Sequence, residues 1–417
     1  MKSYEFAHVV LYKILNDSLS FNLAIILASK DKKLLPDEKR LGLTLAGSTL
    51  RHFLSLDFVA TKKLNIKDLD LRINSLLYLD NKFFVKKLDD NCILDYIKSS
   101  VERHEIDANF DEIKAQLEAV DTLIPTDFEQ TNSYYQALRF NCPKWIVDMW
   151  RKHFGENVTY KQLKANTKPS SSFVSFYYDS SDLSTNNDFE KTDYDNVYKY
   201  VGKEALRKSH ELIENYCFAY KPVFEHCFKE VDLDPLRGTA LYLEYMSPVV
   251  LRLSKLLNGS SFDCICGNNP TFNKVNAELE KFKIDTSKVQ RYEAKASSII
   301  TCISKPVHTF IVMPQSSNLT LLKNDPDYFL KFKQDQLDSI IESELLSLVE
   351  ASNLVEENGQ LIYIIETMNK KESLNVINTF LNEHKDFTLL KHHQYFSFER
   401  DESTLYYAIL VKKSGTN

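Results

Sequence analysis

The chain has 417 residues, of which 43% are hydrophobic and 26% are charged, and its formal net charge is −6 at pH 7. This length accommodates two or three domains of ordinary size, and the negative balance argues against a globally basic nucleic-acid-binding protein. Seven scattered cysteines without a secretory signal are typical of reduced thiols rather than of a disulfide framework. The longest apolar runs, such as residues 21–28, are too short for a bilayer span, which takes roughly 20 residues. We therefore expect a cytoplasmic protein with no targeting peptide and no membrane contact.

Residues 1–125 have the periodicity of an all-helical domain. Apolar side chains recur at spacings of three and four, and a break at residues 35–37 separates two helical segments. A stretch with two glycines, residues 42–47, predicts close packing of helices. Residues 1–67 contain eleven Lys and Arg against six Asp and Glu. This local excess predicts either a patch that meets phosphate or a solvated, lysine-rich helical face.

Residues 126–235 differ in character from the helical domain. Residues 134–140 predict a helix, and a second helix is predicted between Pro143 and Gly155, because proline favours helix starts and glycine favours helix ends. Residues 173–178 predict a strand, and the polar stretch that follows predicts a surface loop. The pattern of this region therefore predicts helices followed by a strand and a loop.

Residues 236–417 alternate short apolar runs with helical patterns. The predicted strands are residues 262–266, 299–303, 309–313, 361–365 and 406–411, and the predicted helices are residues 274–282, 332–355 and 372–383. Such alternation predicts a mostly parallel, doubly wound sheet, in which ligands bind beyond the carboxyl ends of the strands. The loops after Cys266, Met313 and Ile365 are therefore the expected place for chemistry. Cys264 and Cys266 form a CxC pair with no second pair or nearby histidine, which indicates a buried strand and no metal site.

Several segments carry a resemblance to a known family. Residues 7–11 (AHVVL) and 47–51 (GSTLR) belong to the helical domain. Residues 137–147 (ALRFNCPKWIV) hold an Arg, a Pro and a Trp at a specific spacing. Residues 324–327 (NDPD) form a polar-Pro-Asp turn, and residues 359–363 (GQLIY) begin the closing strands. Together these segments resemble the Sun-type, RsmB-like ribosomal RNA cytosine-5 methyltransferases over nearly the whole chain.

The resemblance implies a fold and a domain order. Residues 236–417 should form an α/β Rossmann-like S-adenosylmethionine methyltransferase domain. Residues 1–125 should form an all-α, NusB-like RNA-binding domain, and residues 126–235 should form a linker and a small α/β RNA-binding subdomain.

The chemistry of this family needs cysteine, because carbon 5 of cytosine becomes nucleophilic only after a thiolate adds to carbon 6. The family's catalytic loop reads Asp-x-Pro-Cys-Ser where this chain has VMPQS, so that Val312 replaces the carboxylate and Gln315 replaces a cysteine. The family's second cysteine, in a Thr-Cys-Ser strand end, is matched by Glu366. The stretch from 294 to 324 contains neither Asp nor Glu, and no cysteine follows Cys302. The sequence therefore predicts no catalytic residue at these positions.

The resemblance also implies S-adenosylmethionine as the cofactor. The family's loop Asp-x-Cys-Ala-Ala-Pro-Gly-Gly-Lys is matched to residues 264–272 (CICGNNPTF), where Pro270 and Thr271 replace the glycine pair that lets the ligand approach the backbone. Asp285 matches the acid that holds the ribose hydroxyls, or else it caps a surface helix. The adenine-binding Asp, expected near Cys302, is missing. We therefore expect a vestigial site that does not bind the cofactor.

Four residues fall in modules that the resemblance makes RNA-facing, namely Arg51, Arg139, Lys144 and Trp145. The three cations predict either phosphate contacts or ordinary salt bridges. Trp145 either stacks on a base or docks the linker onto the methyltransferase domain. His308, beside a strand, is expected to be structural rather than a general base.

The leading hypothesis is a non-catalytic member of this family that binds ribosomal RNA or an assembling small ribosomal subunit. Two alternatives stay open. One is an active S-adenosylmethionine-dependent rRNA methyltransferase that uses displaced residues. The other is a transcription or assembly factor that acts through the NusB-like domain and protein contacts.

Overall fold

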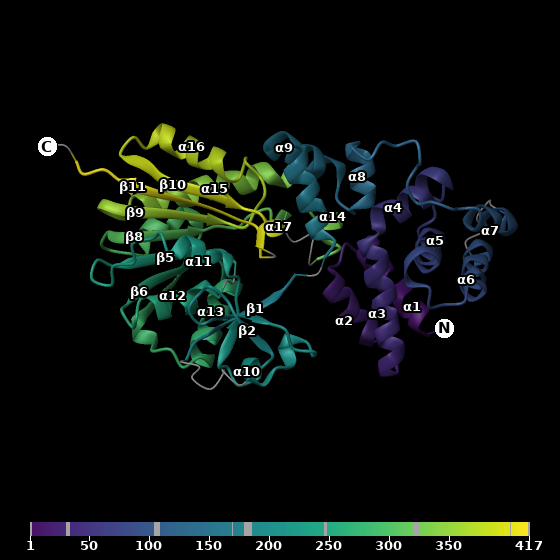
Figure 1. Ribbon diagram of the computed structural model, residues 1–417, viewed down its shortest axis with the longest axis horizontal. Helices are drawn as coiled ribbons and strands as arrows, with labels where there is room; N and C mark the ends of the chain where they lie inside the picture. The colour runs from purple at the N-terminus through teal and green to yellow at the C-terminus, as the bar shows by residue number, and fades with distance from the viewer. Residues whose placement is uncertain are drawn as a thin grey trace. The chain divides into compact units, whose positions relative to one another are not determined.

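The structure is a computed structural model that describes residues 2–30, 34–103, 109–168, 170–178, 186–245, 248–319, 325–400 and 402–415. The chain forms two compact units, a helical unit of residues 1–168 and 321–333 and a sheet unit of residues 169–320 and 334–417 (Figure 1). The expected boundaries at residues 125 and 235 do not coincide with these units, because the segment 126–168 belongs to the helical unit. No helix in the described ranges is long and apolar enough to cross a membrane.

The helical unit is all α, as its periodicity predicts. Its helices are α1 (Lys2–Leu15), α2 (Phe21–Lys30), α3 (Pro36–Arg51), α4 (Phe53–Phe58), α5 (Leu69–Asp80), α6 (Asp90–Arg103), α7 (Phe110–Glu118), α8 (Ser133–Arg139), α9 (Lys144–Asn166) and α14 (Tyr328–Lys331), with π-helical turns η1 (Val59–Lys63) and η2 (Asn81–Val85). One continuous core runs from α1 to α7, with Tyr4, Phe6 and Leu45 fully buried. This shared core accounts for the apolar spacing of three and four along the segment.

Helix α3 begins where the sequence predicts a break. Pro36 occupies its first turn, and the Glu38 carboxylate accepts a hydrogen bond from the Leu35 amide at 2.8 Å. Gly42 lies so close to α1 that an added Cβ would be 2.7 Å from Cδ1 of Phe6. A side chain at this position would force the two helices apart, so the predicted close packing of helices is confirmed.

Helix α9 continues past the expected stop. Gly155 has φ 81° and ψ 169°, which interrupts the helical backbone, and the helix then resumes up to Asn166. Trp150 is buried before the kink, and Thr159 and Leu163 are buried after it. Because the residues beyond the glycine again bury one face at helical spacing, the glycine makes a kink where an end was predicted.

A return segment, residues 325–333, belongs to the helical unit although its neighbours in sequence belong to the sheet unit. Asp327 is fully buried there, and its carboxylate accepts a hydrogen bond from the Phe21 amide at 2.9 Å. Burial first, and then the hydrogen bond and charge of Asp327, raise the pKa of Asp325 to about 7. The predicted polar-Pro-Asp turn falls in this segment, with its first residue outside the described part of the chain.

The sheet unit contains a seven-stranded sheet with the order β10-β11-β9-β8-β5-β6-β7. Its strands are β5 (Thr239–Leu243), β6 (Phe262–Cys266), β7 (Val289–Glu293), β8 (Val307–Met313), β9 (Val355–Ile365), β10 (Phe387–Tyr395) and β11 (Leu405–Lys412). Neighbouring strands are parallel from β9 across to β7, and β11 runs antiparallel to both β9 and β10. The predicted mostly parallel sheet is confirmed.

Helices cover both faces of this sheet (Figure 1). The helical elements of the unit are α10 (His210–Ile213), α11 (Val223–Phe228), α12 (Val249–Leu256), α13 (Asn269–Lys281), α15 (Leu337–Ser352), α16 (Leu374–Glu383) and α17 (Ser397–Arg400), with 3-10 turns η4 (Leu206–Lys208), η5 (Thr286–Lys288), η6 (Ala296–Thr301) and η8 (Gln334–Gln336). Leu241 and Ile311 share a core with α11, α12 and α13, whereas Tyr242 and Val312 share a core with α15 and α16. Successive residues of one strand thus face different layers, which explains why these strands read as continuous apolar runs.

Four of the five predicted strands are confirmed, and one is wrong. Residues 299–303 do not form a strand, because the 3-10 helix η6 covers their first half. Within η6, Ile299 is buried whereas Ile300 is 45% exposed. Three strands of the seven-stranded sheet were not predicted, namely β5 and the two edge strands β7 and β10. The residues of β7, VQRYE, are polar apart from the first and the tyrosine.

A second, antiparallel sheet has the order β2-β3-β1-β4. Its strands are β1 (Ser172–Phe176), β2 (Phe189–Lys191), β3 (Val197–Tyr200) and β4 (Cys217–Ala219). Val174, Phe176 and Phe189 are buried in its small core. The strand predicted at residues 173–178 corresponds to β1.

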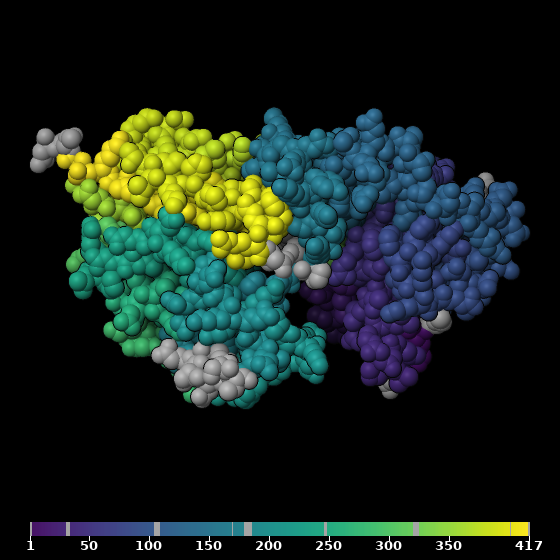
Figure 2. Space-filling model, in the orientation of Figure 1, coloured from purple at the N-terminus to yellow at the C-terminus, as the bar shows by residue number. Residues whose placement is uncertain are grey.

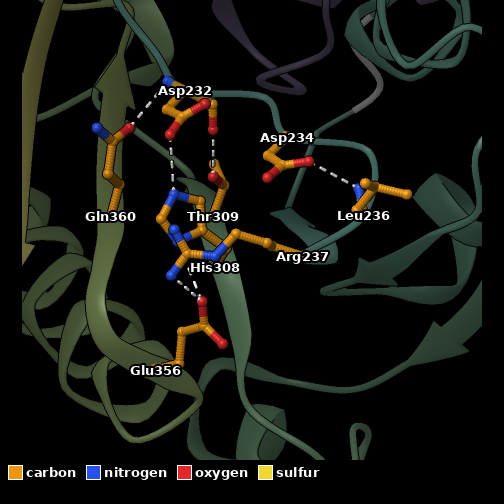
Figure 3. A network of polar contacts seen from close by, with 8 residues as sticks. All are labelled: Asp232, Asp234, Leu236, Arg237, His308, Thr309, Glu356 and Gln360. Carbon is orange, nitrogen blue, oxygen red and sulfur yellow. Dashed lines mark hydrogen bonds and ion pairs between the residues drawn. The ribbon is translucent and has the colours of Figure 1, made fainter.

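Hydrogen bonds and ion pairs connect residues at the amino ends of β5, β8 and β9 (Figure 3). His308 is 2% exposed, with Nε2 3.1 Å from Asp232 Oδ2 and Nδ1 3.2 Å from Glu356 Oε1. Arg237 also pairs with Glu356, and the Thr309 hydroxyl donates to the Asp232 carbonyl oxygen at 2.6 Å. Both ring nitrogens of His308 face carboxylates at the edge of the sheet opposite the expected ligand edge, so His308 has the structural position expected for it.

Candidate functional site

The carboxyl ends of β5 and β8 form the topological switch point of the large sheet. From β5 the chain proceeds to β6 and β7 on one side, and from β8 it proceeds to β9 on the other side. In open α/β sheets, ligands bind in the crevice at such a point. The candidate site is therefore built by the residues that follow these strands, among them Glu244, Gly267, Gln315 and Glu366.

Glu244 directly follows β5 and forms hydrogen bonds with residues that follow the neighbouring strands. Its carboxylate accepts hydrogen bonds from the Tyr242 hydroxyl at 2.5 Å and from the main-chain N–H of Gln315 at 2.7 Å. Its main-chain carbonyl oxygen accepts hydrogen bonds from the Asn268 side chain at 2.7 Å and from the Thr271 hydroxyl at 3.0 Å. One residue therefore ties together the loops that follow β5, β6 and β8.

Gly267 leaves room for the Glu244 side chain. A Cβ added to Gly267 would lie 2.4 Å from Cγ of Glu244 and 2.9 Å from the Tyr242 hydroxyl. Burial, and then the charge of Glu244, raise the pKa of Tyr242 far above its ordinary value. The tyrosine therefore stays protonated and donates to the carboxylate, which holds Glu244 against the Gly267 backbone.

The residues that follow β5 and β6 differ from those of a nucleotide-binding sheet. In nucleotide-binding sheets, a glycine-rich turn after the first strand lets the ligand approach the backbone, and an acid further along binds the ribose. Here the residues that follow β5 in the sequence are Glu-Tyr-Met-Ser-Pro, without glycine. The Glu244 side chain lies against Gly267, at the point after β6 where a cofactor would approach the backbone.

The structure places the matched cofactor loop and Asp285 elsewhere than expected. Residues 264–272 were matched to the first strand and its loop, but they belong to β6 and α13, and β5 precedes them in the sheet. Asp285 precedes β7, which runs parallel to β6, and so it lies at the amino edge of the sheet. Its carboxylate accepts hydrogen bonds from the Ser287 amide at 2.9 Å and hydroxyl at 2.7 Å. Asp285 therefore caps the short helix η5 at the surface, which is the second of its two expected roles.

The three positions that the resemblance makes catalytic lie at or near the carboxyl edge in different surroundings. Val312 is fully buried within β8 and faces the helices α15 and α16. Gln315 is exposed, with its amide held by the carboxylate described above. Glu366 is 4% exposed, and its carboxylate forms an ion pair with Lys221. None of these three side chains is a nucleophile that could attack a base carbon.

The cysteines of the large sheet are poor candidates for a displaced nucleophile. Cys266 ends β6 fully buried, with its sulfur 4.0 Å from the sulfur of Cys264. Cys302 is partly exposed, but burial raises the pKa of its thiol. Catalysis by cysteine needs an accessible thiolate, and neither position provides one.

Glu372 joins the loops that follow β8 and β9. Its buried carboxylate accepts hydrogen bonds from the amide and the hydroxyl of Ser317, both at 2.6 Å. It also accepts hydrogen bonds from the Thr367 hydroxyl at 3.0 Å and from the Asn369 side chain at 2.8 Å. The Tyr363 hydroxyl donates to its carbonyl oxygen at 2.7 Å. The two loops that bear cysteines in the resembled family are thus held together here by one carboxylate.

A second acid, Glu344 of α15, is fully buried close to Glu372. Burial first, and then the charge of Glu372, raise the pKa of Glu344 well above its ordinary value of 4.5. The folded chain therefore keeps a proton on Glu344 at a pH where the unfolded chain has released it. The stability that Glu344 contributes is fully present below pH 4.5 and is lost as the pH rises through the raised pKa.

We predict that Glu344→Gln makes the sheet unit more stable at neutral pH, because glutamine has the shape of the protonated acid and carries no charge. The free energy of unfolding of the natural chain should fall relative to that of the variant as the pH rises above 4.5, by up to about 1.4 kcal/mol for each pH unit. Denaturant unfolding from pH 4 to pH 8, followed by circular dichroism, measures this difference. Parallel stability curves for the two proteins would contradict the assignment.

The structure brings the predicted RNA-facing residues into one part of the helical unit, with Trp145 directly after Lys144. Arg51 ends α3, Arg139 ends α8 and Lys144 begins α9. Asn141, in the turn between α8 and α9, donates from its side chain to the Leu50 carbonyl oxygen at 2.8 Å and accepts from the first turn of α4. This turn therefore rests on the junction of α3 and α4, next to Arg51.

The surroundings of the predicted RNA-facing residues differ from one another. Arg139 is exposed, and its guanidinium donates to the Tyr135 hydroxyl at 2.8 Å. Lys144 is also exposed and pairs with an acid one turn further along α9. Trp145 is half-buried and stacks on Phe332 of the return segment, with ring centroids 6.4 Å apart. Trp145 thus packs within the helical unit, in which the segment of α8 and α9 is coloured blue (Figure 2).

Sequence reasoning missed Glu244, Glu372 and Lys221. The available signal for Glu244 was the apolar run of β5 directly before it, which has the length of a strand. No sequence signal links Lys221 to Glu366, because 145 positions separate them. Among the described residues, no group of His, Cys, Asp and Glu has the arrangement of a metal site.

The comparisons with known proteins identify solved structures with the same fold. No family model and no curated protein matches this chain. The crystal structure of PH0851 is similar over 99% of this chain and 98% of its own, with a TM-score of 0.74 and 14% identity. A methyltransferase homolog protein from Pyrococcus horikoshii covers 67% of this chain and 98% of its own, with a TM-score of 0.56 and 11% identity. NSun6 from Pyrococcus horikoshii, solved with SFG, covers 66% of this chain and 99% of its own, with a TM-score of 0.57 and 8% identity.

The chain has a Rossmann-like methyltransferase fold preceded by an all-α region. The expectation that the sequence resemblance raised is thus confirmed at the level of the fold. Identities of 8–14% are too low to carry over activity, cofactor or substrate. Those have to be argued from the residues of this chain.

Proposed function

We propose that this chain is a non-catalytic RNA-binding protein built on the methyltransferase fold, and that it binds ribosomal RNA or an assembling small ribosomal subunit. The observation that carries the non-catalytic part is the position of Glu244. Its carboxylate binds the Gln315 amide and its side chain lies against Gly267. Glu244 thus takes up space next to Gly267, where a nucleoside cofactor would have to approach the backbone, and this supports the proposal.

The tied loops support the same proposal. Glu372 holds the loops after β8 and β9 through buried hydrogen bonds, and Glu366 is paired with Lys221. Gln315 and Glu366 stand where methylation of cytosine needs thiols. The fold is kept while its reactive groups are replaced, which suits a binding role better than catalysis.

The RNA part of the proposal rests on the helical unit, which we interpret as NusB-like. Arg51, Arg139 and Lys144 are exposed and lie around one turn. Residues 1–67 add a local excess of Lys and Arg. Exposed cations on one face are the electrostatic footprint of a phosphate-binding surface, and the sequence resemblance to ribosomal RNA methyltransferases supports RNA as its partner.

Two alternatives make different demands on the molecule. An active methyltransferase requires Glu244 to leave the crevice and requires a target atom other than carbon 5, because no accessible thiolate is at hand. A transcription or assembly factor requires only the helical unit. In that case changes at the carboxyl edge of the large sheet would leave RNA affinity unchanged.

The proposal predicts salt-dependent binding of the full chain to a fragment of small-subunit ribosomal RNA. The variant Arg51→Gln/Arg139→Gln/Lys144→Gln should bind at least about tenfold more weakly. Its plot of log affinity against log salt should be flatter by about two, because each lost phosphate contact removes roughly 0.7–0.9 from the slope. Filter binding between 50 mM and 300 mM salt measures both quantities.

A matched control for this experiment is the variant Lys203→Gln/Lys208→Gln/Lys288→Gln. These three lysines are exposed on the sheet unit and lie outside the proposed surface. The control should retain affinity and slope. Equal weakening in both variants, or no binding by the natural chain, would contradict the proposed surface.

A further inference from the structure

The helical unit contains a cavity of about 660 Å³ beside the proposed RNA surface. The cavity lies among the turn η2, the junction of α3 and α4, helix α8 and the connecting residues 121–130. Aromatic rings form much of its lining, together with Arg139 and His52. Its volume falls in the ordinary range for small-ligand sites, about 300–1,000 Å³.

One wall of the cavity is a locked pair of rings. The His52 ring stacks on Phe84 with centroids 3.5 Å apart and an interplanar angle of 8°. Nδ1 of His52 lies 3.3 Å from Oδ1 of Asp80, which is fully buried and also accepts from the Ser48 hydroxyl at 2.9 Å. Phe84 is 41% exposed. The buried acid thus fixes the orientation of a flat surface that is open to solvent.

Another part of the lining carries a cation whose position is restricted by its neighbours. The Arg139 guanidinium donates to the Tyr135 hydroxyl, and its central carbon lies 5.9 Å from the Tyr135 ring centroid and 5.7 Å from the Phe140 ring centroid. The two rings limit the positions of the guanidinium, which remains exposed. An arginine held in this way is suited to bidentate contact with a phosphate.

The backbone wall is preformed. Lys82 Nζ donates to the carbonyl oxygens of Glu118 at 2.8 Å and Val120 at 2.7 Å, and Lys63 Nζ donates to the Thr122 carbonyl oxygen at 3.3 Å. These lysines hold the connecting residues in place. Lys63 thereby adds positive charge beside Thr122, which lines the cavity together with the acid Asp121.

We propose that this cavity binds one unstacked nucleotide of single-stranded RNA, with its base on Phe84 and a phosphate on Arg139. The inference rests on the proposed function, because it names the place where the RNA is held. Base stacking on aromatic rings and phosphate contact by arginine are the two features of single-strand recognition. The charge complementarity and the continuity with the Arg51 surface favour this occupant over an apolar peptide.

The test uses Phe84→Leu in the full chain, because leucine keeps apolar volume but removes the flat aromatic face. Calorimetry with each of the four nucleoside 5′-monophosphates should show binding to the natural chain. Affinity for the preferred nucleotide should fall about tenfold or more in the variant, the loss that removal of one stacked base typically causes. Affinity for an unstructured ribosomal RNA fragment should fall by a similar factor.

The control variant is Tyr12→Leu, which removes an aromatic ring of similar exposure, 39%, from α1 outside the cavity lining. It should bind nucleotides and RNA as the natural chain does, and thermal unfolding should show that both variants are folded. Unchanged nucleotide and RNA affinity in Phe84→Leu would overturn the cavity assignment while RNA binding elsewhere stands. Nucleotide binding without any RNA binding would overturn the proposed function and leave a cavity for free nucleotides. Binding of neither ligand would overturn both.

Discussion

Replacing Glu372 by Ala is expected to destabilise the sheet unit by about 3 kcal/mol or more. The substitution leaves the Ser317 amide, the Thr367 hydroxyl and the Asn369 side chain without their buried acceptor. Each buried donor that loses its partner costs about 1–3 kcal/mol. For a unit of this size, the loss corresponds to a fall in melting temperature of roughly 6–12 °C.

The measurement for this prediction is thermal unfolding followed by far-ultraviolet circular dichroism and by tryptophan fluorescence. Both tryptophans, Trp145 and Trp150, belong to the helical unit, so fluorescence reports that unit separately. The conservative variant Glu372→Gln should fall between the natural chain and Glu372→Ala, because it keeps one acceptor oxygen. A melting temperature unchanged within 2 °C in Glu372→Ala would contradict the role given to this carboxylate.

Replacing Glu225 by Leu is expected to destabilise the sheet unit by about 3–5 kcal/mol. Arg252, only 3% exposed, donates to the two carboxylate oxygens of Glu225 at 2.8 Å and 2.7 Å. The Tyr220 hydroxyl donates to the same carboxylate at 2.6 Å. Without the acid, the guanidinium is buried and unpaired, which costs more than the pair contributes.

The triple variant Glu225→Leu/Arg252→Met/Tyr220→Phe distinguishes the cost of an unpaired buried charge from the cost of altered packing. It removes all three polar partners together, so its free energy of unfolding should return to within about 1 kcal/mol of the natural value or exceed it. The exposed pair of Lys208 and Glu204 provides the control, and Lys208→Gln should change stability by less than about 0.5 kcal/mol. A triple variant as unstable as the single variant would show that packing, and not charge, dominates this site.

The helices and strands were predictable where the local sequence pattern alone indicates the structure. Helix α3 begins at a proline after a break, and β8 is a fully buried run. The sequence pattern did not predict the structure of segments whose conformation depends on contacts with residues distant in the sequence. The edge strand β7 buries few side chains, and so it lacks an apolar run. Ile299 and Ile300 look like part of a strand, but only Ile299 faces the core.

The candidate site was predictable only in part. The positions of Gln315 and Glu366 follow from motifs in single loops, and the structure places both at the carboxyl edge. The role of Glu244 depends on the neighbouring strand β8, since its carboxylate binds an amide 71 positions away. Asp285 was matched by its motif to a ribose-binding acid, but it lies at the amino edge of the sheet. A motif alone does not reveal the edge of the sheet on which a residue lies. Strand order is set by long-range packing, which no local pattern encodes.

A non-catalytic protein in which Glu244 lies against Gly267 should not bind S-adenosylmethionine at the switch point. The measurement that tests it most directly is calorimetric titration of the full chain with S-adenosylmethionine and with its demethylated product. We predict no binding of either ligand at millimolar concentration. Micromolar binding of either ligand would show that Glu244 leaves the crevice, and it would contradict the proposal of a non-catalytic protein.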